Sequence, residues 1–237
     1  MLKTLNILDM NSRHKSDKNY IPCETVGCYC PSSRGDKDLC YSFRYIDNNK
    51  NFIYYDIPKC ASTTIRDLLF PDAWKHFTDG PCRHSLLESI VPNKKYFSFT
   101  FARNPWSRMV SNWSHFCNEP LIREKLEDSD VNMNCCSSFK DFVYMTLNFN
   151  NHHWQPQHLY IPKSGCDFIG KIENFNEDFN RVCEILQIPS QNLSRKNTSD
   201  HKHYTEYYDD ETREIVAQKY ARDIEYFGYK FRFNDDP

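Results

Sequence analysis

The stretch that most constrains the fold is NFIYYDIPKCASTTIRDLLF, residues 51–70. Residues 51–57 are rich in aromatic and β-branched side chains, as a buried strand should be, and Pro58 ends the strand because proline cannot donate to a sheet ladder. Residues 59–64 then supply a lysine, small side chains and three consecutive hydroxyls where a helix begins. A helix start leaves backbone N–H groups unpaired and carries partial positive charge, so this turn is predicted to hold an anion.

A second strand is predicted at residues 96–102, and it ends at Arg103. Pro105 then starts a helix on which Ser107 and Ser111 are four residues apart and share a face. Ser111 can therefore point at an anion that Arg103 also reaches. Arginine suits this role because its planar fork binds phosphate oxygens in pairs.

Further along the chain, a third strand is predicted at residues 167–173, and helices are predicted at 139–147, 177–186 and 210–226. Strands that alternate with helices indicate an α/β fold with a central, mostly parallel sheet flanked by helices. In such sheets ligands bind beyond the carboxyl ends of the strands, where both polar loops lie. Two anion sites at two strand ends predict one ligand with two separate phosphate groups. The chain lacks G-x-x-x-x-G-K-[ST], which disfavours an ordinary ATP or GTP loop.

Composition and charge limit the class of protein. The 237 residues, 39% of them apolar, suffice for one main domain at residues 48–237, with a polar, cysteine-containing extension at residues 1–47 packed on it. A net charge of -2 argues against a strongly electrostatic nucleic-acid binder. No apolar stretch approaches the ~20 residues of a membrane span, and no secretory signal begins the chain. We therefore expect a soluble, cytoplasmic protein, or a Golgi or secreted one if an anchor has been removed.

Eleven cysteines are more than a cytosolic enzyme usually carries. Cys23, Cys28, Cys30 and Cys40 follow the spacing C-x4-C-x-C-x9-C, which lacks the paired CxxC of common zinc sites. A metal site, disulfides in an oxidising compartment, and free thiols all stay open for this group. Cys60 has no base beside it in the sequence, so we interpret it as a small packing residue and not as a nucleophile.

The two anion loops resemble a known family. PKCASTTI at residues 58–65 resembles the 5′-phosphosulfate loop of sulfotransferases, and FARNPWSRMVS at 101–111 resembles their 3′-phosphate motif. Three further stretches resemble the carbohydrate sulfotransferase branch, which includes the chondroitin, dermatan, HNK-1 and uronyl 2-O-sulfotransferases: HWQPQ at 153–157, DFIGKIENFNEDF at 167–179 and YARDIEYFGYKF at 220–231. The resemblance covers about residues 52–231 and implies a three-layer fold like that of the P-loop NTPases.

The resemblance implies 3′-phosphoadenosine 5′-phosphosulfate (PAPS) as the sulfuryl donor, 3′,5′-diphosphoadenosine as the product, and no metal. It assigns to Lys59 the binding of the phosphosulfate and the stabilisation of charge on the leaving phosphate. The rest of that loop contributes Cys60, Ala61, Ser62, Thr63 and Thr64. Arg103 and Ser111 would hold the 3′-phosphate. The stretch SRKNTS at 194–199 resembles the loop that closes over the nucleotide and adds Arg195, Lys196 and Thr198.

In-line transfer also needs a base, because an alcohol is a poor nucleophile. The uronyl 2-O-sulfotransferases place a histidine between the two anion motifs, and His84, nineteen residues before Arg103, is the residue we expect in that role. His76 and His153 are the rivals, and His153 with Trp154 can instead line the acceptor cleft or pack beneath it. The expected acceptor is a carbohydrate hydroxyl, with a small-molecule alcohol as the alternative. An ATP-using kinase or nucleotide-binding module and a lectin-like binder are the competing classes.

Overall fold

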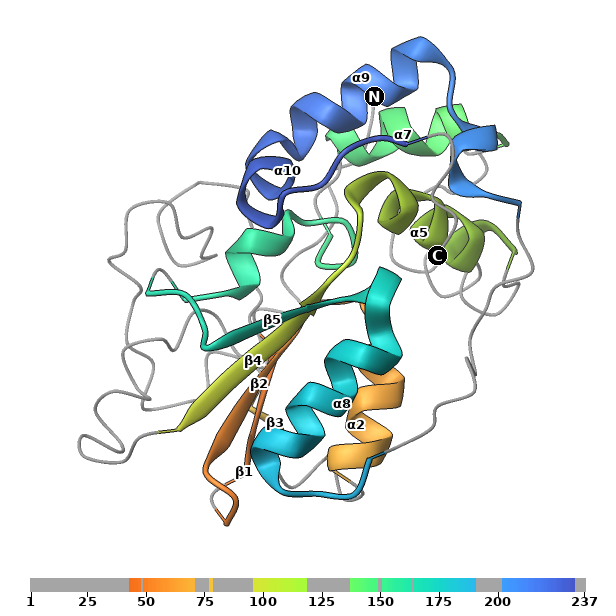
Figure 1. The fold of residues 1–237 in the computed structure, drawn as a ribbon. Coiled ribbons are helices and arrows are strands. Elements are labelled where there is room, and N and C mark those ends of the chain that lie inside the picture. Colours follow the sequence, from red (N-terminus) through yellow and green to blue (C-terminus); the bar gives the residue numbers. More distant parts are fainter. Residues whose placement is uncertain are drawn as a thin grey trace, which may run out of the picture.

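One mixed sheet of five strands, in the order β3-β1-β2-β4-β5, forms the centre of the fold (Figure 1). The computed structural model describes residues 43–47, 49–70, 77–78, 96–118, 137–148, 151–162, 164–190 and 202–232. The strands in these ranges are β1 Phe43–Asp47, β2 Phe52–Asp56, β3 Phe77–Thr78, β4 Phe97–Ala102 and β5 Phe168–Lys171. β2, β4 and β5 are parallel, whereas β1 pairs antiparallel with both β2 and β3. The predicted mostly parallel sheet is confirmed.

Helices flank the sheet and continue past the carboxyl end of β4 (Figure 1). The helices are α2 Ser62–Leu69, α5 Pro105–Asn118, α7 Phe139–Asn148, α8 Phe175–Leu186, α9 Asp210–Lys219 and α10 Ala221–Phe227. Three short 3-10 helices add η2 Gln157–Tyr160, η3 Ile172–Asn174 and η4 Tyr204–Tyr207. The α/β fold predicted from the sequence is therefore confirmed. Within the described residues, no helix has both the length and the apolar character that a membrane crossing requires.

Two apolar clusters make up the core. The first joins the sheet to α2 and α8, through side chains such as Phe99, Ile65 and Phe179. The second joins α5, α7 and α9 around Trp106 and other aromatic residues. Ala102 at the end of β4 belongs to the first cluster and Trp106 to the second. The chain between these two residues therefore passes from one cluster to the other, and this passage contains the second polar loop.

The strand β1 was not predicted from the sequence. Residues 43–47, which we expected to close the N-terminal extension, pair with the whole of β2, from Phe43 opposite Asp56 to Asp47 opposite Phe52. Their sequence, FRYID, alternates only weakly, and a strand this short takes its conformation from its partner. The remainder of the expected extension, including Cys23, Cys28, Cys30 and Cys40, lies outside the described residues.

The single helix predicted at residues 210–226 is wrong in one respect, because the structure divides it into α9 and α10 at Tyr220. Tyr220 is buried, and its hydroxyl donates to the carbonyl oxygen of Trp154 at 2.6 Å. Its backbone leaves the helical region, with φ -111° and ψ 23°. Packing of this one side chain therefore redirects α10, so that Asp223 contacts η2.

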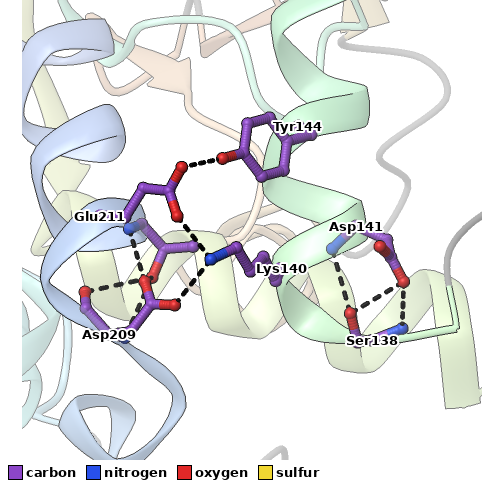
Figure 2. A network of polar contacts seen from close by, with 7 residues as sticks. Ser138, Lys140, Asp141, Tyr144, Asp209 and Glu211 are labelled. Carbon is purple, nitrogen blue, oxygen red and sulfur yellow. Dashed lines mark hydrogen bonds and ion pairs between the residues drawn. The ribbon is translucent and has the colours of Figure 1, made fainter.

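A polar network on the surface joins α7 to α9 (Figure 2). The Lys140 ammonium contacts Asp209 Oδ2 at 3.0 Å and Glu211 Oε2 at 2.5 Å, and the Tyr144 hydroxyl donates to Glu211. Asp209 also caps α9 by accepting from the backbone N–H of Thr212 at 2.7 Å. These groups are largely exposed, so each ion pair contributes little to the free energy of unfolding.

Gly170 on β5 leaves room for the Phe101 ring of β4, two residues before Arg103. A Cβ at Gly170 would lie 2.4 Å from Cε1 of that ring, and the ring is held by Phe175 at a centroid distance of 5.2 Å. We expect Gly170→Ala to lower the free energy of unfolding by about 1–3 kcal/mol through overpacking. Urea denaturation measures this change. The penalty should shrink when Phe101 is replaced by leucine, and equal penalties in the two backgrounds would contradict the steric explanation.

Candidate active site

The first loop joins β2 to α2 through two left-handed backbone positions. Lys59 has φ 69° and Ala61 has φ 58°, although neither is glycine. Such positions cost about 1–2 kcal/mol each and concentrate at functional sites. The loop closes on the carbonyl oxygen of Ile57, which accepts from the Cys60 N–H at 3.1 Å and the Ser62 hydroxyl at 3.0 Å. No side chain of the described residues caps α2, so the N–H groups of its first turn can bind an anion.

The three hydroxyl residues of the first loop form the first turn of α2, as the sequence predicted. The Ser62 hydroxyl donates its hydrogen to the Ile57 carbonyl oxygen, so it must leave this bond before it can donate to an anion. Thr63 Oγ1 accepts from Arg66 Nη2 at 3.4 Å on the exposed side of the helix. Thr64 is half-buried in the same turn.

The second loop carries Arg103 and connects β4 to α5. The Arg103 Nε–H donates to Ser107 Oγ at 3.0 Å, one helical turn before the buried Ser111. Its Nη1 reaches the backbone carbonyl of Lys59 at 3.5 Å, which brings the second loop against the first. Asn104 caps α5 by accepting from the Trp106 N–H at 3.0 Å. The two predicted anion loops therefore lie side by side at the carboxyl ends of adjacent parallel strands.

Gln157 on η2 connects the two loops. Its Oε1 accepts from the Cys60 thiol at 3.3 Å and from the Arg103 backbone N–H at 2.9 Å. Its Nε2 donates to the Arg103 carbonyl at 2.8 Å. The side chain is fully buried. Gln157 lies in the HWQPQ stretch, but the sequence did not predict its role, because its bonding partners lie 54 and 97 residues away.

Arg108 is a second residue of the candidate site that the sequence did not predict. It lies on α5 with 2% of its surface exposed, and it donates from Nε to the Pro58 carbonyl at 3.0 Å and from Nη1 to the Gln155 carbonyl at 2.7 Å. Its Nη2 has no hydrogen-bond partner among the residues that the structure describes. Among the ion pairs of the described residues, neither Arg103 nor Arg108 contacts a carboxylate. Buried or half-buried positive charge that has no direct carboxylate partner favours an anionic ligand.

Cys60 is a structural thiol within the first loop. Burial raises the pKa of Cys60 to about 12, so the thiol stays neutral and donates to Gln157. A nucleophilic cysteine needs a lowered pKa. In the described part of the chain Cys60 and Cys166 are free thiols, and no group of three His, Cys, Asp or Glu side chains suits a metal ion.

His153 and Trp154 lie next to the loops in the stretch that leads to η2. Burial, followed by the charges of His152 and Lys59, lowers the pKa of His153 to about 2, so His153 is neutral at physiological pH. Its Nδ1 lies 2.9 Å from Asn151 Oδ1. Trp154 is 2% exposed and packs edge-on against Phe116 at a centroid distance of 5.5 Å. Trp154 is therefore part of the core, and its expected place in or beneath the acceptor cleft stays a prediction.

The remaining site residues predicted from the sequence lie outside the described residues: His76, His84, Arg195, Lys196 and Thr198.

Loops that carry lysine and arginine at the carboxyl ends of adjacent parallel strands are typical of α/β proteins that bind phosphorylated ligands. Residues 43–230 match the model of the sulfotransferase family. The chain therefore belongs to the sulfotransferase family, and the expected resemblance to sulfotransferases is confirmed at this level. Membership indicates a transferase of sulfuryl groups that acts on a hydroxyl-bearing acceptor.

A relative of this chain occurs in Archaeoglobus fulgidus. It is described as an uncharacterized protein and is 32% identical over 114 residues, which cover 46% of this chain and 82% of the relative. No solved structure matches this chain.

Proposed function

We propose that this sulfotransferase takes its sulfuryl group from PAPS and transfers it by in-line displacement to a carbohydrate hydroxyl, with His84 as the base. The donor assignment rests on one observation: the loop that carries Lys59 and the loop that carries Arg103 are bonded to each other. Arg103 contacts the backbone of Lys59 at 3.5 Å, and Gln157 bonds both loops. A ligand with anionic groups at both ends suits such a unit, and PAPS has a 5′-phosphosulfate and a 3′-phosphate.

The residues present fit this ligand. Arg103 and Arg108 are held by carbonyl and hydroxyl oxygens, and neither has a direct ion pair in the described part of the chain, although the Glu173 carboxylate is close enough to interact with Arg103. The uncapped start of α2 adds backbone donors. When bound, PAPS supplies a sulfuryl group already activated by its link to phosphate.

Within this assignment, Lys59 and the first turn of α2 bind the phosphosulfate end. Lys59 stabilises the charge that builds on the leaving phosphate, and the hydroxyls of Ser62, Thr63 and Thr64 hold its oxygens. Preorganised positive groups of this kind supply the largest share of catalysis in many enzymes. Cys60 and Ala61 contribute backbone only, because Cys60 is buried and Ala61 has no polar side chain.

Arg103 and Ser111 bind the 3′-phosphate at the other end. Arg195, Lys196 and Thr198 complete this side of the nucleotide. This end distinguishes PAPS from ATP, which lacks a 3′-phosphate. The acceptor is then expected on the side of the phosphosulfate, where His153 lies near Lys59.

Calorimetry tests the donor. We expect 3′,5′-diphosphoadenosine to bind with a clear heat signal and Mg-ATP to bind much more weakly. Tighter binding of Mg-ATP would favour a kinase-like module and overturn the donor assignment. Labelled donor offered to a panel of glycans and small alcohols then tests the acceptor, and transfer confined to small alcohols would overturn the carbohydrate assignment.

Arg103→Ala is expected to weaken binding of 3′,5′-diphosphoadenosine by about 10- to 150-fold, the range for a charge-assisted hydrogen bond. Binding of adenosine 5′-monophosphate should change far less, because that analogue lacks the 3′-phosphate. Titration calorimetry with both ligands gives the comparison. Arg181→Ala, which removes an exposed arginine paired with Glu177 on α8, is the matched control. An unchanged preference for the diphosphate in Arg103→Ala would count against this role.

A further inference from the structure

We infer that Gln157 is a positioning residue that sets the separation of the two anion loops, so that the two ends of the nucleotide bind cooperatively. This inference rests on the proposed function and adds a residue to which neither the loop motifs nor the family match assigns a role. It is drawn from the way one buried amide is shared between the loops.

Both the oxygen and the nitrogen of the Gln157 side-chain amide form hydrogen bonds. Its oxygen accepts from the Cys60 thiol at 3.3 Å and from the Arg103 N–H at 2.9 Å, and its nitrogen donates to the Arg103 carbonyl at 2.8 Å. The backbone donor and acceptor of Arg103 are therefore both held by one side chain, directly after β4 ends. An amide is the neutral group that supplies an acceptor and a donor together, whereas an ionised carboxylate only accepts.

The other side of Gln157 is fixed to α10. The Gln157 backbone N–H donates to Asp223 Oδ2 at 2.6 Å. The backbone N–H and ring Nδ1 of His158 contact Asp223 Oδ1 at 2.9 Å and 2.6 Å. Asp223 and the Gln157 side chain are both fully buried. A carboxylate with these partners is fixed in orientation, so η2 and the Gln157 side chain have a rigid support.

Two bonds among the described contacts join the loop motifs directly, besides the pairing of β2 with β4. Between their residues, the described contacts include the Arg103 Nη1 to Lys59 carbonyl bond at 3.5 Å, which is near the limit for a hydrogen bond. Arg108 adds a bond from α5 to the carbonyl oxygen of Pro58, the first residue of the PKCASTTI motif, at 3.0 Å. Gln157 adds three bonds to these contacts, and we assign to it a share in fixing the spacing of the two phosphate sites. A ligand bound at both ends gains affinity from its second end when that spacing is already correct.

The test compares three ligands on the full chain: 3′,5′-diphosphoadenosine, adenosine 5′-monophosphate and adenosine 3′-monophosphate. The quantity of interest is the affinity of the diphosphate relative to each monophosphate. In Gln157→Met, which keeps the length and loses the bonds, we expect this advantage to fall by about 5- to 150-fold, the usual range of coupling between two sites. Affinity for each monophosphate should change much less.

Cys60→Ala provides a second, milder variant, since it removes only the bond to the first loop and leaves the Arg103 bonds in place. It should reduce the diphosphate advantage in the same direction and by a smaller factor. Gln218→Met removes an exposed glutamine bonded to Glu214 on α9 and should leave all three affinities within about twofold.

Two results would overturn the inference. If both Gln157→Met and Cys60→Ala weaken all three ligands by the same factor, Gln157 only supports the fold. If both variants keep the full diphosphate advantage, the spacing is set elsewhere. A wild-type protein that binds the diphosphate no better than the monophosphates would instead overturn the proposed donor, and this inference with it.

Discussion

Lys59→Ala is expected to lower the turnover of sulfuryl transfer by about 10²- to 10³-fold, as removal of one charge-stabilising donor does in other enzymes. Lys59 lies in the turn between β2 and α2, and its charge is close enough to lower the pKa of His153. Alanine has the same Cβ constraint at φ 69°, so the loop backbone should be kept. Binding of the product nucleotide should weaken only moderately, because Lys59 acts mainly on charge that develops during transfer.

Steady-state assays with labelled donor, together with calorimetry on 3′,5′-diphosphoadenosine, separate the two effects of Lys59→Ala. Lys50→Ala is the matched control, because Lys50 is an exposed lysine in the turn between β1 and β2. Its backbone N–H bonds Asp47, and this bond survives loss of the side chain. A Lys59→Ala enzyme with wild-type turnover would remove Lys59 from the catalytic assignment.

His84→Ala is the second large effect, with an expected loss of about 10²- to 10⁴-fold in transfer, the usual contribution of a general base. Nucleotide affinity should stay intact, since the base acts on the acceptor hydroxyl. The acid limb of the pH profile should also disappear, because it reflects protonation of the base. Rate measurements from pH 5 to 9 record both changes.

His153 is the described rival for the role of base, and its environment argues against it. With a pKa of about 2, His153 holds a proton poorly, whereas an efficient base has a pKa near the working pH. His153→Asn should therefore cost much less activity than His84→Ala, and His203→Ala serves as an exposed histidine control. If His84→Ala stays active and His153→Asn does not, the base is His153.

Much of the fold was predictable because its signals are local. The strand and helix on either side of residues 57–61 follow from a run of aromatic residues, a proline and a cluster of hydroxyls in direct succession. The strand that ends at Ala102 and the helix that starts at Pro105 follow from the same kind of pattern. Because parallel strands bring their carboxyl ends to one edge, the nearness of the two loops was predictable as well.

The residues that join the loops were not predictable from local signals. Gln157 is defined by bonds to residues far away in sequence, and a glutamine between prolines and aromatic residues has no characteristic pattern of its own. From its sequence position, Arg108 is typical of the surface of an amphipathic helix. In the structure it is buried and bonds the carbonyl oxygens of Pro58 and Gln155. The division of α9 from α10 likewise depends on the distant partner of Tyr220.

The passage of the chain from one apolar cluster to the other connects the two candidate anion loops to different parts of the core. The first loop belongs to the sheet cluster through Cys60, and the helix after the second loop belongs to the other cluster through Trp106. A slip between the two clusters would move Lys59 relative to Arg103. Ligand affinity therefore depends on how the two apolar clusters are aligned. We expect it to change with core substitutions that are too mild to shift the unfolding curve.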